Sequence, residues 1–248
     1  MKTSLIVPLY NEAARIRCTL PRIIVYANRL WGPAAEIIGV NDGSTDETVA
    51  CWQQAIVEAH HDALASMQCT IRLLHHPHNQ GKGAAVRTGI LSATGSTRIF
   101  LDADLSTPVT MWGTMEAALT GLHAPDVIMA SRWIPASRFV VPQPLYRQAM
   151  SRTFNALLRW QTGLPYRDTQ CGAKGFTATS ADALFTPLRS DGFIFDVEVL
   201  LHATQSGMTV HEVPVAWTDQ RGSTVHAWRD SWQMFWAARH LARQAEVH

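Results

Sequence analysis

Short apolar runs alternate along the chain with longer segments whose apolar residues recur three or four positions apart. The short runs end at turn residues, which is typical of strands buried in a parallel sheet. The longer segments have the spacing of amphipathic helices. We predict strands at residues 4–7, 36–40, 70–74, 97–101 and 126–130, and helices at 11–31, 44–66, 84–94 and 111–122.

This alternation predicts an α/β fold with a Rossmann-like, mostly parallel central sheet and helices on both faces. The second half of the chain is less regular, with a long helix predicted at residues 145–162 and a strand at 209–216. A chain of 248 residues is long enough for a substantial core. We expect one catalytic domain over residues 1–225, followed at 226–248 by an amphipathic helix.

Composition narrows the class of protein. The 21 Lys and Arg nearly balance the 20 Asp and Glu, so the net charge of +1 disfavours a nucleic-acid partner. The four cysteines are widely spaced, which favours reduced, mostly buried thiols over disulfides or a zinc site. No apolar run approaches the length of about 18 residues that a membrane span needs. We therefore expect a cytoplasmic protein, or one bound peripherally to the cytoplasmic face of a membrane.

Polar clusters follow three predicted strands where each strand ends, at residues 8–12, 41–46 and 102–104. In doubly wound sheets, ligands bind beyond the carboxyl ends of the strands, so these clusters should line one site. Asp102 and Asp104 offer the hard oxygen ligands that Mg²⁺ or Mn²⁺ requires beside a phosphate group, although such pairs also occur in solvated turns. Ser106 is within reach as a third ligand, and Asp42 is placed to accept hydrogen bonds from a nucleobase or ribose.

A glycine-containing loop, N-Q-G-K-G at residues 79–83, enters a predicted helix. Such a loop allows close approach of a nucleotide to the backbone, and Lys82 is placed to meet a phosphate. The loop lacks the spacing of a P-loop. No G-x-G-x-x-G motif follows the first strand, which argues against a dinucleotide oxidoreductase.

Arginine is concentrated in one acid-free segment. Of the 21 cationic residues 18 are Arg, and residues 127–167 contain six Arg but no Asp or Glu. Arginine binds phosphate oxygens in a bidentate manner, so this segment favours an anionic substrate. Arg132, at a strand end, and Arg147, at a helix start, are best placed for it, whereas Arg152 and Arg159 fit a solvated helix face.

Two further features allow two interpretations each. Asp196 lies in an apolar stretch, where it either orients an acceptor or an arginine, or forms a structural ion pair. Three tryptophans recur four residues apart in the last segment, at Trp228, Trp232 and Trp236. This stripe fits an interfacial membrane helix, or a helix that docks on its own core or on a second copy in a homodimer.

The ordered set of motifs resembles the family 2 inverting glycosyltransferases of the GT-A fold. It resembles more narrowly the dolichyl-phosphate β-glucosyltransferases and bacterial polyprenyl-phosphate relatives. The resemblance spans residues 3–240 and rests on V-P-L-Y-N-E (7–12), N-D-G-S-T-D (41–46), N-Q-G-K-G (79–83), D-A-D-L-S-T-P (102–108), S-R (131–132), D-T-Q-C-G-A-K (168–174) and F-D-V-E (195–198).

The resemblance implies the transfer of a hexose, expected to be glucose from UDP-glucose, to a polyprenyl phosphate. A UDP-sugar is expected over a GDP-sugar. Pro8, Tyr10, Glu12 and Asp42 would hold the nucleoside. Asp102, Asp104 and Ser106 would serve Mg²⁺ or Mn²⁺ and the donor diphosphate. The arginines Arg132, Arg147 and Arg221 would meet the acceptor phosphate or the diphosphate. Helices near the C-terminus would lie on the acceptor side.

Three other functions stay open at this stage. The same fold could transfer sugar to a hydroxyl of a glycan, metabolite or natural product, and Asp196 would then be the first candidate for a general base. A sugar-nucleotide nucleotidyltransferase shares the sheet and the carboxylates, but it usually has a Gly-rich signature after the first strand. A non-catalytic binding module would not need both Asp102 and Asp104.

Overall fold

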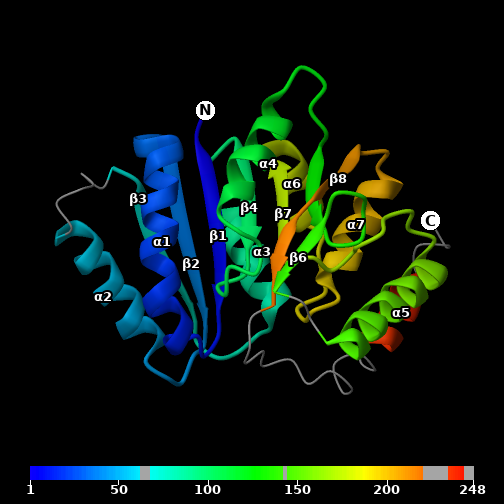
Figure 1. Ribbon diagram of the computed structural model, residues 1–248, viewed down its shortest axis with the longest axis horizontal. Coiled ribbons are helices and arrows are strands. Elements are labelled where there is room, and N and C mark those ends of the chain that lie inside the picture. Colours follow the sequence, from blue (N-terminus) through cyan, green and yellow to red (C-terminus); the bar gives the residue numbers. More distant parts are fainter. Residues whose placement is uncertain (62–67, 142–143, 220–233, 243–248) are drawn as a thin grey trace.

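The computed structural model describes residues 1–61, 68–141, 144–219 and 234–242. A central sheet of seven strands is covered by helices on both faces (Figure 1). The strands are β1 (Thr3–Leu9), β2 (Ala35–Asp42), β3 (Thr70–His76), β4 (Thr97–Leu101), β5 (Val127–Ser131), β7 (Ala173–Thr177) and β8 (Val210–Pro214), with β6 (Arg138–Val141) and β9 (Ala216–Thr218) in a second, two-stranded sheet. The helices are α1 (Ala13–Trp31), η1 (Gly32–Ala34), α2 (Thr48–His61), α3 (Lys82–Ser92), α4 (Thr110–Thr120), α5 (Leu145–Thr162), α6 (Ala178–Phe185) and α7 (Phe195–Gln205).

The strands of the central sheet follow the order β3-β2-β1-β4-β7-β5-β8. All are parallel except β7, which runs antiparallel between β4 and β5. The predicted mostly parallel sheet with helices on both faces is confirmed. Side chains of α1, α2 and α4 pack in the core on one face, and those of α3, α6 and α7 pack in the core on the other.

The elements that the hydrophobic pattern did not predict are η1, β6, β7, β9, α6 and α7. Strand β7 carries a lysine and a glycine, so it lacks the apolar run of its neighbours. Helix α7 is buried around most of its circumference, which removes the amphipathic periodicity that predicts a helix. The start of α1 also differs from expectation, because Asn11 has a left-handed φ of 53° and the helix begins at Ala13.

The last described segment, residues 234–242, is helical and packs beside α5 and α7. Its buried face consists of Ala238 with Met234, Ala237 and Leu241, whereas Trp236 is 51% exposed. This part therefore docks on the core of its own chain, and it does so through small and aliphatic side chains. Trp228, Trp232 and Arg221 lie outside the described residues. Within the described ranges, no helix has the length and hydropathy to cross a bilayer.

Candidate active site

The D-x-D motif forms a tight turn directly after β4. Leu105 has a left-handed φ of 54°, and its N–H donates to the carbonyl oxygen of Asp102 at 3.2 Å. The Asp104 carboxylate accepts from the backbone N–H of Ser106 at 2.8 Å, and Thr218 of β9 donates to the Ser106 carbonyl at 3.0 Å. The turn is therefore tied to the second sheet, and both aspartates lie at the carboxyl end of the parallel strands.

Asp102 pairs with the lysine of the glycine loop. The Lys82 ammonium lies 2.6 Å from Oδ1 of Asp102, and the two side chains are 20% and 34% exposed. On its other side, the Asp102 carboxylate lies against Gly172, where a Cβ atom would overlap Oδ2. The sequence links neither partner to Asp102, since both come from segments distant along the chain.

Negative charge is concentrated at this turn. Burial and the neighbouring Asp102 carboxylate together raise the pKa of Asp104 above its usual value. Burial also raises the pKa of Glu12, although Arg15 opposes the shift with contacts of 2.8 and 2.6 Å to its two oxygens. A site in which carboxylates disfavour each other's ionisation is one that a cation would stabilise.

The donor set of this turn fits Mg²⁺ or Mn²⁺. Mg²⁺ is usually held by one or two carboxylates together with substrate phosphates and water, and Asp102 and Asp104 provide two carboxylates on one turn. Ser106 is next to them and buried. Among the described residues, no group of three or more His, Cys, Asp or Glu could hold a metal. A metal here would therefore take its remaining ligands from a phosphate-bearing substrate and water.

Asp42 is a buried anchor for the glycine loop. Its carboxylate accepts from the backbone N–H groups of Gln80 at 2.9 Å and Gly81 at 2.8 Å, and lies 2.7 Å from Nδ1 of His76. The parallel register that pairs Asp42 with His76 in β2 and β3 brings the two side chains together. Asp42 thus places Lys82, and its predicted role in nucleoside binding stays a prediction.

The other predicted nucleoside residues lie at the end of β1. Pro8 is half-buried within β1, and Tyr10 beyond it is 41% exposed. Glu12 is held by Arg15 and by a hydrogen bond from its own backbone N–H to the hydroxyl of Thr48 at 2.8 Å. The ring of Tyr10 is exposed at this edge of the sheet, and its role in nucleoside binding stays a prediction.

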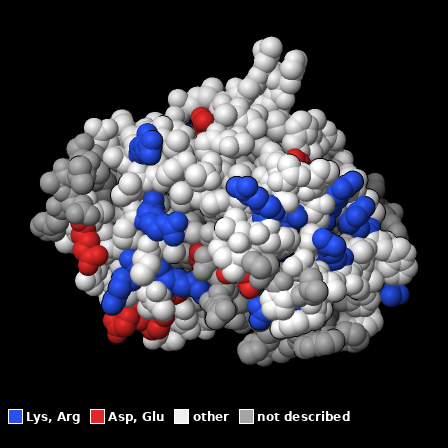
Figure 2. All heavy atoms as spheres, in the orientation of Figure 1, with Lys and Arg blue, Asp and Glu red and all other residues white. Residues whose placement is uncertain are grey.

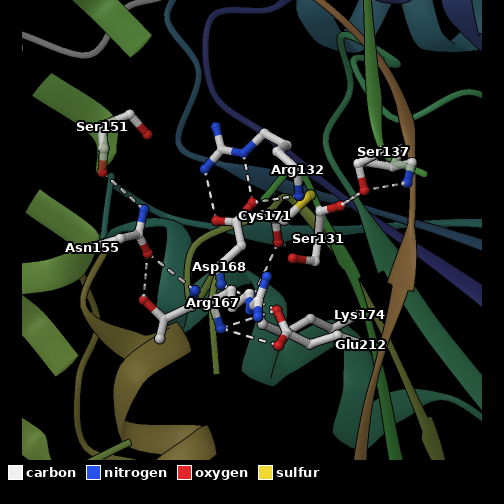
Figure 3. A network of polar contacts seen from close by, with 12 residues as sticks. Ser131, Arg132, Ser137, Ser151, Asn155, Arg167, Asp168, Cys171, Lys174 and Glu212 are labelled. Carbon is white, nitrogen blue, oxygen red and sulfur yellow. Dashed lines mark hydrogen bonds and ion pairs between the residues drawn. The ribbon is translucent and has the colours of Figure 1, made fainter. Parts of the chain in front are cut away.

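Arg132 is held rigidly at the end of β5. Its Nε and Nη2 lie 2.7 and 2.8 Å from the two oxygens of Asp168, and its backbone N–H donates to the same carboxylate at 2.9 Å (Figure 3). Its guanidinium also lies near Trp217, 5.6 Å from the ring centroid. Asp168 is fully buried, and the two charges raise the pKa of Arg132 and lower that of Asp168 despite burial.

The other predicted phosphate ligands are less constrained. Arg147, in the first turn of α5, has a side chain that is 51% exposed and lies 4.0 Å from the Asp219 carboxylate. Arg221 is outside the described residues. The structure therefore defines the surroundings of Arg132 and Arg147, and the phosphate-binding roles of all three arginines stay predictions.

Asp196 lies in the first turn of α7 and pairs with Lys174 of β7 at 2.7 Å. The Lys174 ammonium also donates to the carbonyl oxygen of Cys171 at 3.0 Å, and both charged side chains are almost completely buried. Burial raises the pKa of Asp196, while the ammonium of Lys174 opposes that shift. Of the two interpretations, this geometry favours the structural ion pair.

Sequence reasoning left out three residues that shape this site: Lys174, Gly172 and Asp168. All three belong to the segment 168–174, whose motif was apparent while the roles of its members were not. Their partners Asp196, Asp102 and Arg132 are 22, 70 and 36 positions away, so only the folded sheet shows the pairs. The available signal in the sequence was an acid and a lysine within one short motif, residues 168–174.

The fold is shared with solved enzymes of low sequence identity. Glucosyl-3-phosphoglycerate synthase from Mycobacterium tuberculosis matches 96% of this chain and 80% of that chain, with a TM-score of 0.68 at 16% identity. A structure of the same synthase with Mn²⁺, UDP and glucosyl-3-phosphoglycerate matches 99% of this chain and 78% of that chain, with a TM-score of 0.64 at 17% identity. This likeness shows that the chain has the GT-A fold of that synthase, with the D-x-D turn at the carboxyl edge of its sheet.

Sequence comparison gives the family. The model of "Glycosyl transferase family 2" matches residues 4–176. Dolichyl-phosphate beta-glucosyltransferase of Drosophila melanogaster is 34% identical over 90% of this chain and 69% of its own length. The human protein of that name is 30% identical over 89% of this chain and 68% of its own length. This chain belongs to glycosyl transferase family 2, as its motifs predicted, and it is a glycosyltransferase.

Proposed function

We propose that this glycosyltransferase moves glucose from UDP-glucose to the phosphate of a polyprenyl or dolichyl lipid, with inversion at the anomeric carbon. The observation that carries the proposal is the 30–34% identity, over 89–93% of the chain, to proteins named dolichyl-phosphate beta-glucosyltransferase. The arrangement of acids and arginines at one edge of the sheet supports it, because both substrates carry phosphate.

The donor lies along the carboxyl ends of β1, β2 and β4 in this proposal. Tyr10 and Glu12 border the nucleoside, and Asp42 fixes the loop that carries Lys82 toward the diphosphate. Asp102 and Asp104 would hold Mg²⁺ or Mn²⁺, with Ser106 as an additional oxygen ligand. When bound, the metal neutralises charge on the diphosphate leaving group.

The acceptor phosphate is bound by Arg132 together with Arg147 and Arg221. A phosphate oxygen forms the new bond to the anomeric carbon, and the bond from that carbon to UDP breaks with its electron pair on UDP. The pair with Asp168 keeps the Arg132 guanidinium in one orientation, so the phosphate is placed without loss of side-chain freedom at that step. Attack from the face opposite UDP inverts the configuration.

A lipid phosphate is already an anion near neutral pH, so its attack needs no general base. A hydroxyl acceptor would need one, and the first candidate was Asp196. The residue Asp196 is 4% exposed, and its carboxylate is paired with Lys174. The surroundings of Asp196 therefore support a phosphate acceptor over a hydroxyl acceptor.

A lipid acceptor places the enzyme at a membrane, and we assign it to the cytoplasmic face as a peripheral protein. The segment 226–248 is one proposed contact, and a homodimer is the alternative partner for its tryptophans. Vesicle flotation with and without residues 226–248 tests this assignment. Equal binding of both forms would remove the segment as a membrane contact.

The acceptor class is tested by turnover of one donor with paired acceptors. Purified enzyme receives UDP-glucose and Mg²⁺ with a prenyl phosphate, with the corresponding prenyl alcohol, or with a sugar that offers only hydroxyls. We expect glucosylated product from the phosphate alone. Preferential glucosylation of the alcohol or the sugar would contradict the proposal.

A further inference from the structure

We propose that α5 is a membrane-docking helix whose outer face lies on an anionic phospholipid surface beside the site. The inference rests on the proposed lipid acceptor. It gives the protein a second membrane contact besides the one proposed for the segment 226–248. In Figure 1, α5 lies at the end of the molecule remote from α2, next to α7. Its inner face packs on the chain through the buried residues Asn155 and Leu158.

The outer face of α5 carries an uncharged stripe with an aromatic residue at each end. Exposed residues recur at helical spacing, beginning with Tyr146 at 63% and ending with Trp160 at 78% exposure. Between them lie Ala149, Thr153 and Ala156, which are also exposed. Tyrosine and tryptophan favour the headgroup level of a bilayer, where an apolar ring and a polar edge are both satisfied.

The charge along α5 complements an anionic surface. Arg147 and Arg159 are exposed, and the helix contains no Asp or Glu. In Figure 2, the half of the face that includes α5 and α7 shows several Lys or Arg side chains and little Asp or Glu. Each basic residue near an anionic bilayer contributes about 1 kcal/mol to binding.

The distribution of large side chains favours a lipid surface over a protein partner. Protein interfaces concentrate their binding energy in aromatic residues near the centre of the contact. On α5 the centre of the stripe has alanine and threonine, while the large rings stand at its two ends. A helix of 18 residues is about 27 Å long, so its ends would meet the bilayer at two separate points.

The inner side of α5 is linked to the acceptor arginine. Asn155 accepts hydrogen bonds from the backbone N–H and the hydroxyl of Thr169, both at 3.1 Å, and the adjacent Asp168 holds Arg132 (Figure 3). Arg152 lies over the ring of Trp133, 4.6 Å from its centroid, and Trp133 follows Arg132 in the chain. A lipid phosphate at the bilayer surface would thus meet a guanidinium that the docked helix positions.

The test compares an α5 variant with a matched control. Arg159→Glu with Trp160→Ser removes one basic and one aromatic group from the outer face. Arg22→Glu with Val25→Ser makes the same charge change and removes an exposed aliphatic group on the surface of α1, where Val25 is 56% exposed. Vesicles of phosphatidylcholine with phosphatidylglycerol serve as the probe in flotation assays. We expect the α5 variant to bind roughly tenfold more weakly and the control to bind as wild type.

Activity separates this inference from the proposed function. With a short-chain, water-soluble prenyl phosphate, the α5 variant should turn over at the wild-type rate, but with a long-chain acceptor in vesicles it should lose most activity. Equal vesicle binding by wild type and the α5 variant, or no vesicle binding by wild type, would overturn the docking role. No transfer to either acceptor would contradict the proposed function while leaving the binding result interpretable. Trp160→Ser alone, at a highly exposed site, is the second variant if the double variant does not fold.

We infer separately that Lys82 acts as a stand-in cation at Asp102 until metal and donor bind. Its ammonium makes a 2.6 Å contact with Oδ1 of Asp102, one of the two carboxylates that would hold the metal. The backbone before Lys82 is fixed by the hydrogen bonds from Gln80 and Gly81 to Asp42. The flexible four-carbon side chain is therefore the part that can move, from the carboxylate to the diphosphate.

This exchange is tested by Mn²⁺ binding without turnover. Without nucleotide, Lys82→Met should bind Mn²⁺ at least about fivefold more tightly than wild type, because no ammonium competes for Asp102. With Mn²⁺ present, the same variant should bind UDP more weakly. Arg87→Met is the control, since it removes a cation from the same helix that pairs with Asp191 instead. Lys82→Arg should retain the wild-type pattern. Unchanged or weaker Mn²⁺ binding by Lys82→Met, or no Mn²⁺ binding by any form, would overturn the exchange.

Discussion

Asp168 binds Arg132 through both carboxylate oxygens, at 2.7 and 2.8 Å, and also accepts from the Arg132 backbone N–H. The pair joins the end of β5 to the loop that α5 holds through Asn155. It uses Nε and Nη2 of the guanidinium. An arginine has five N–H donors on three nitrogens. Because Asp168 binds Nε and Nη2, we expect Nη1 to be the group that binds an anionic substrate.

Loss of the Asp168 charge should affect stability and acceptor binding together. Asp168→Asn leaves a largely buried guanidinium without its counter-charge, and breaking a buried pair costs about 3–5 kcal/mol. We expect urea denaturation to show a loss of that size at neutral pH. The KM for the lipid phosphate should rise while the Kd for UDP stays unchanged. An unchanged KM would contradict a positioning role for Asp168.

The same pair gives a pH dependence with a definite sign. Burial alone would raise the pKa of Asp168, but the charge and hydrogen bonds of Arg132 hold it below its usual value. A lowered pKa in the folded state stabilises the fold fully above the unfolded-state pKa of about 3.9, and this contribution is lost as the pH falls toward the folded-state pKa. The difference in free energy of unfolding between wild type and Asp168→Asn should therefore be constant from about pH 6 to 7 and shrink below about pH 4. A difference that grows on acidification would show that the sign is wrong.

Gly172 leaves the room that the Asp102 carboxylate occupies. A Cβ atom at this position would overlap Oδ2 of Asp102, so Gly172→Ala must displace that side chain. Since misplacement by about 1 Å can cost two orders of magnitude in rate, we expect kcat/KM to fall about 100-fold. Gly192→Ala is the matched control, because its Cβ would meet no heavy atom within 4 Å. Equal activity of the two variants would refute the steric argument.

The pair of Lys174 and Asp196 should behave as one structural unit. Lys174→Met leaves a buried carboxylate and Asp196→Leu leaves a buried ammonium, and each change should cost about 3–5 kcal/mol. The double variant removes both charges, so its loss should be smaller than the sum by at least about 1 kcal/mol. Denaturation of the four proteins measures this coupling energy. Additive losses would mean that the two charges do not stabilise each other.

The cysteines provide a test of burial that needs no mutation. All four are free thiols, with Cys18 exposed and Cys51, Cys69 and Cys171 buried. Burial raises the pKa of Cys171 to about 12, which keeps that thiol protonated. Titration with a thiol reagent at pH 8 should therefore modify one cysteine rapidly and the other three only after denaturation. Rapid modification of two or more would contradict the described core.

The parallel part of the fold was predictable because its strands carry short apolar stretches that end at turn residues, most clearly in β1, β2 and β5. Strand β7 was not, since Lys174 and Gly175 interrupt its apolar character, and its position between β4 and β5 depends on pairing with both. The burial of Lys174 becomes intelligible only with Asp196 beside it. Periodicity reports the faces of regular elements, and it carries no information about charged residues that pair inside the core.

The site was predictable at the level of which residues gather, and less so for what each one contacts. Strand-end acids identified Asp42, Asp102 and Asp104 because parallel strands end at one edge. The Asp42 carboxylate accepts hydrogen bonds from the backbone of Gln80 and Gly81. Its position depends on the register of β2 and β3, which no local sequence pattern encodes. The ion pair between Asp168 and Arg132 likewise joins residues that are 36 positions apart in the sequence.

The most direct measurement is the product formed from UDP-glucose, labelled in the sugar, and a polyprenyl phosphate in the presence of Mg²⁺. The proposal predicts a lipid-linked β-glucosyl phosphate, formed by wild type and abolished by Asp104→Ala, which should retain its thermal stability. Failure to form a lipid-linked sugar from any nucleotide sugar and any lipid phosphate would contradict the proposed function.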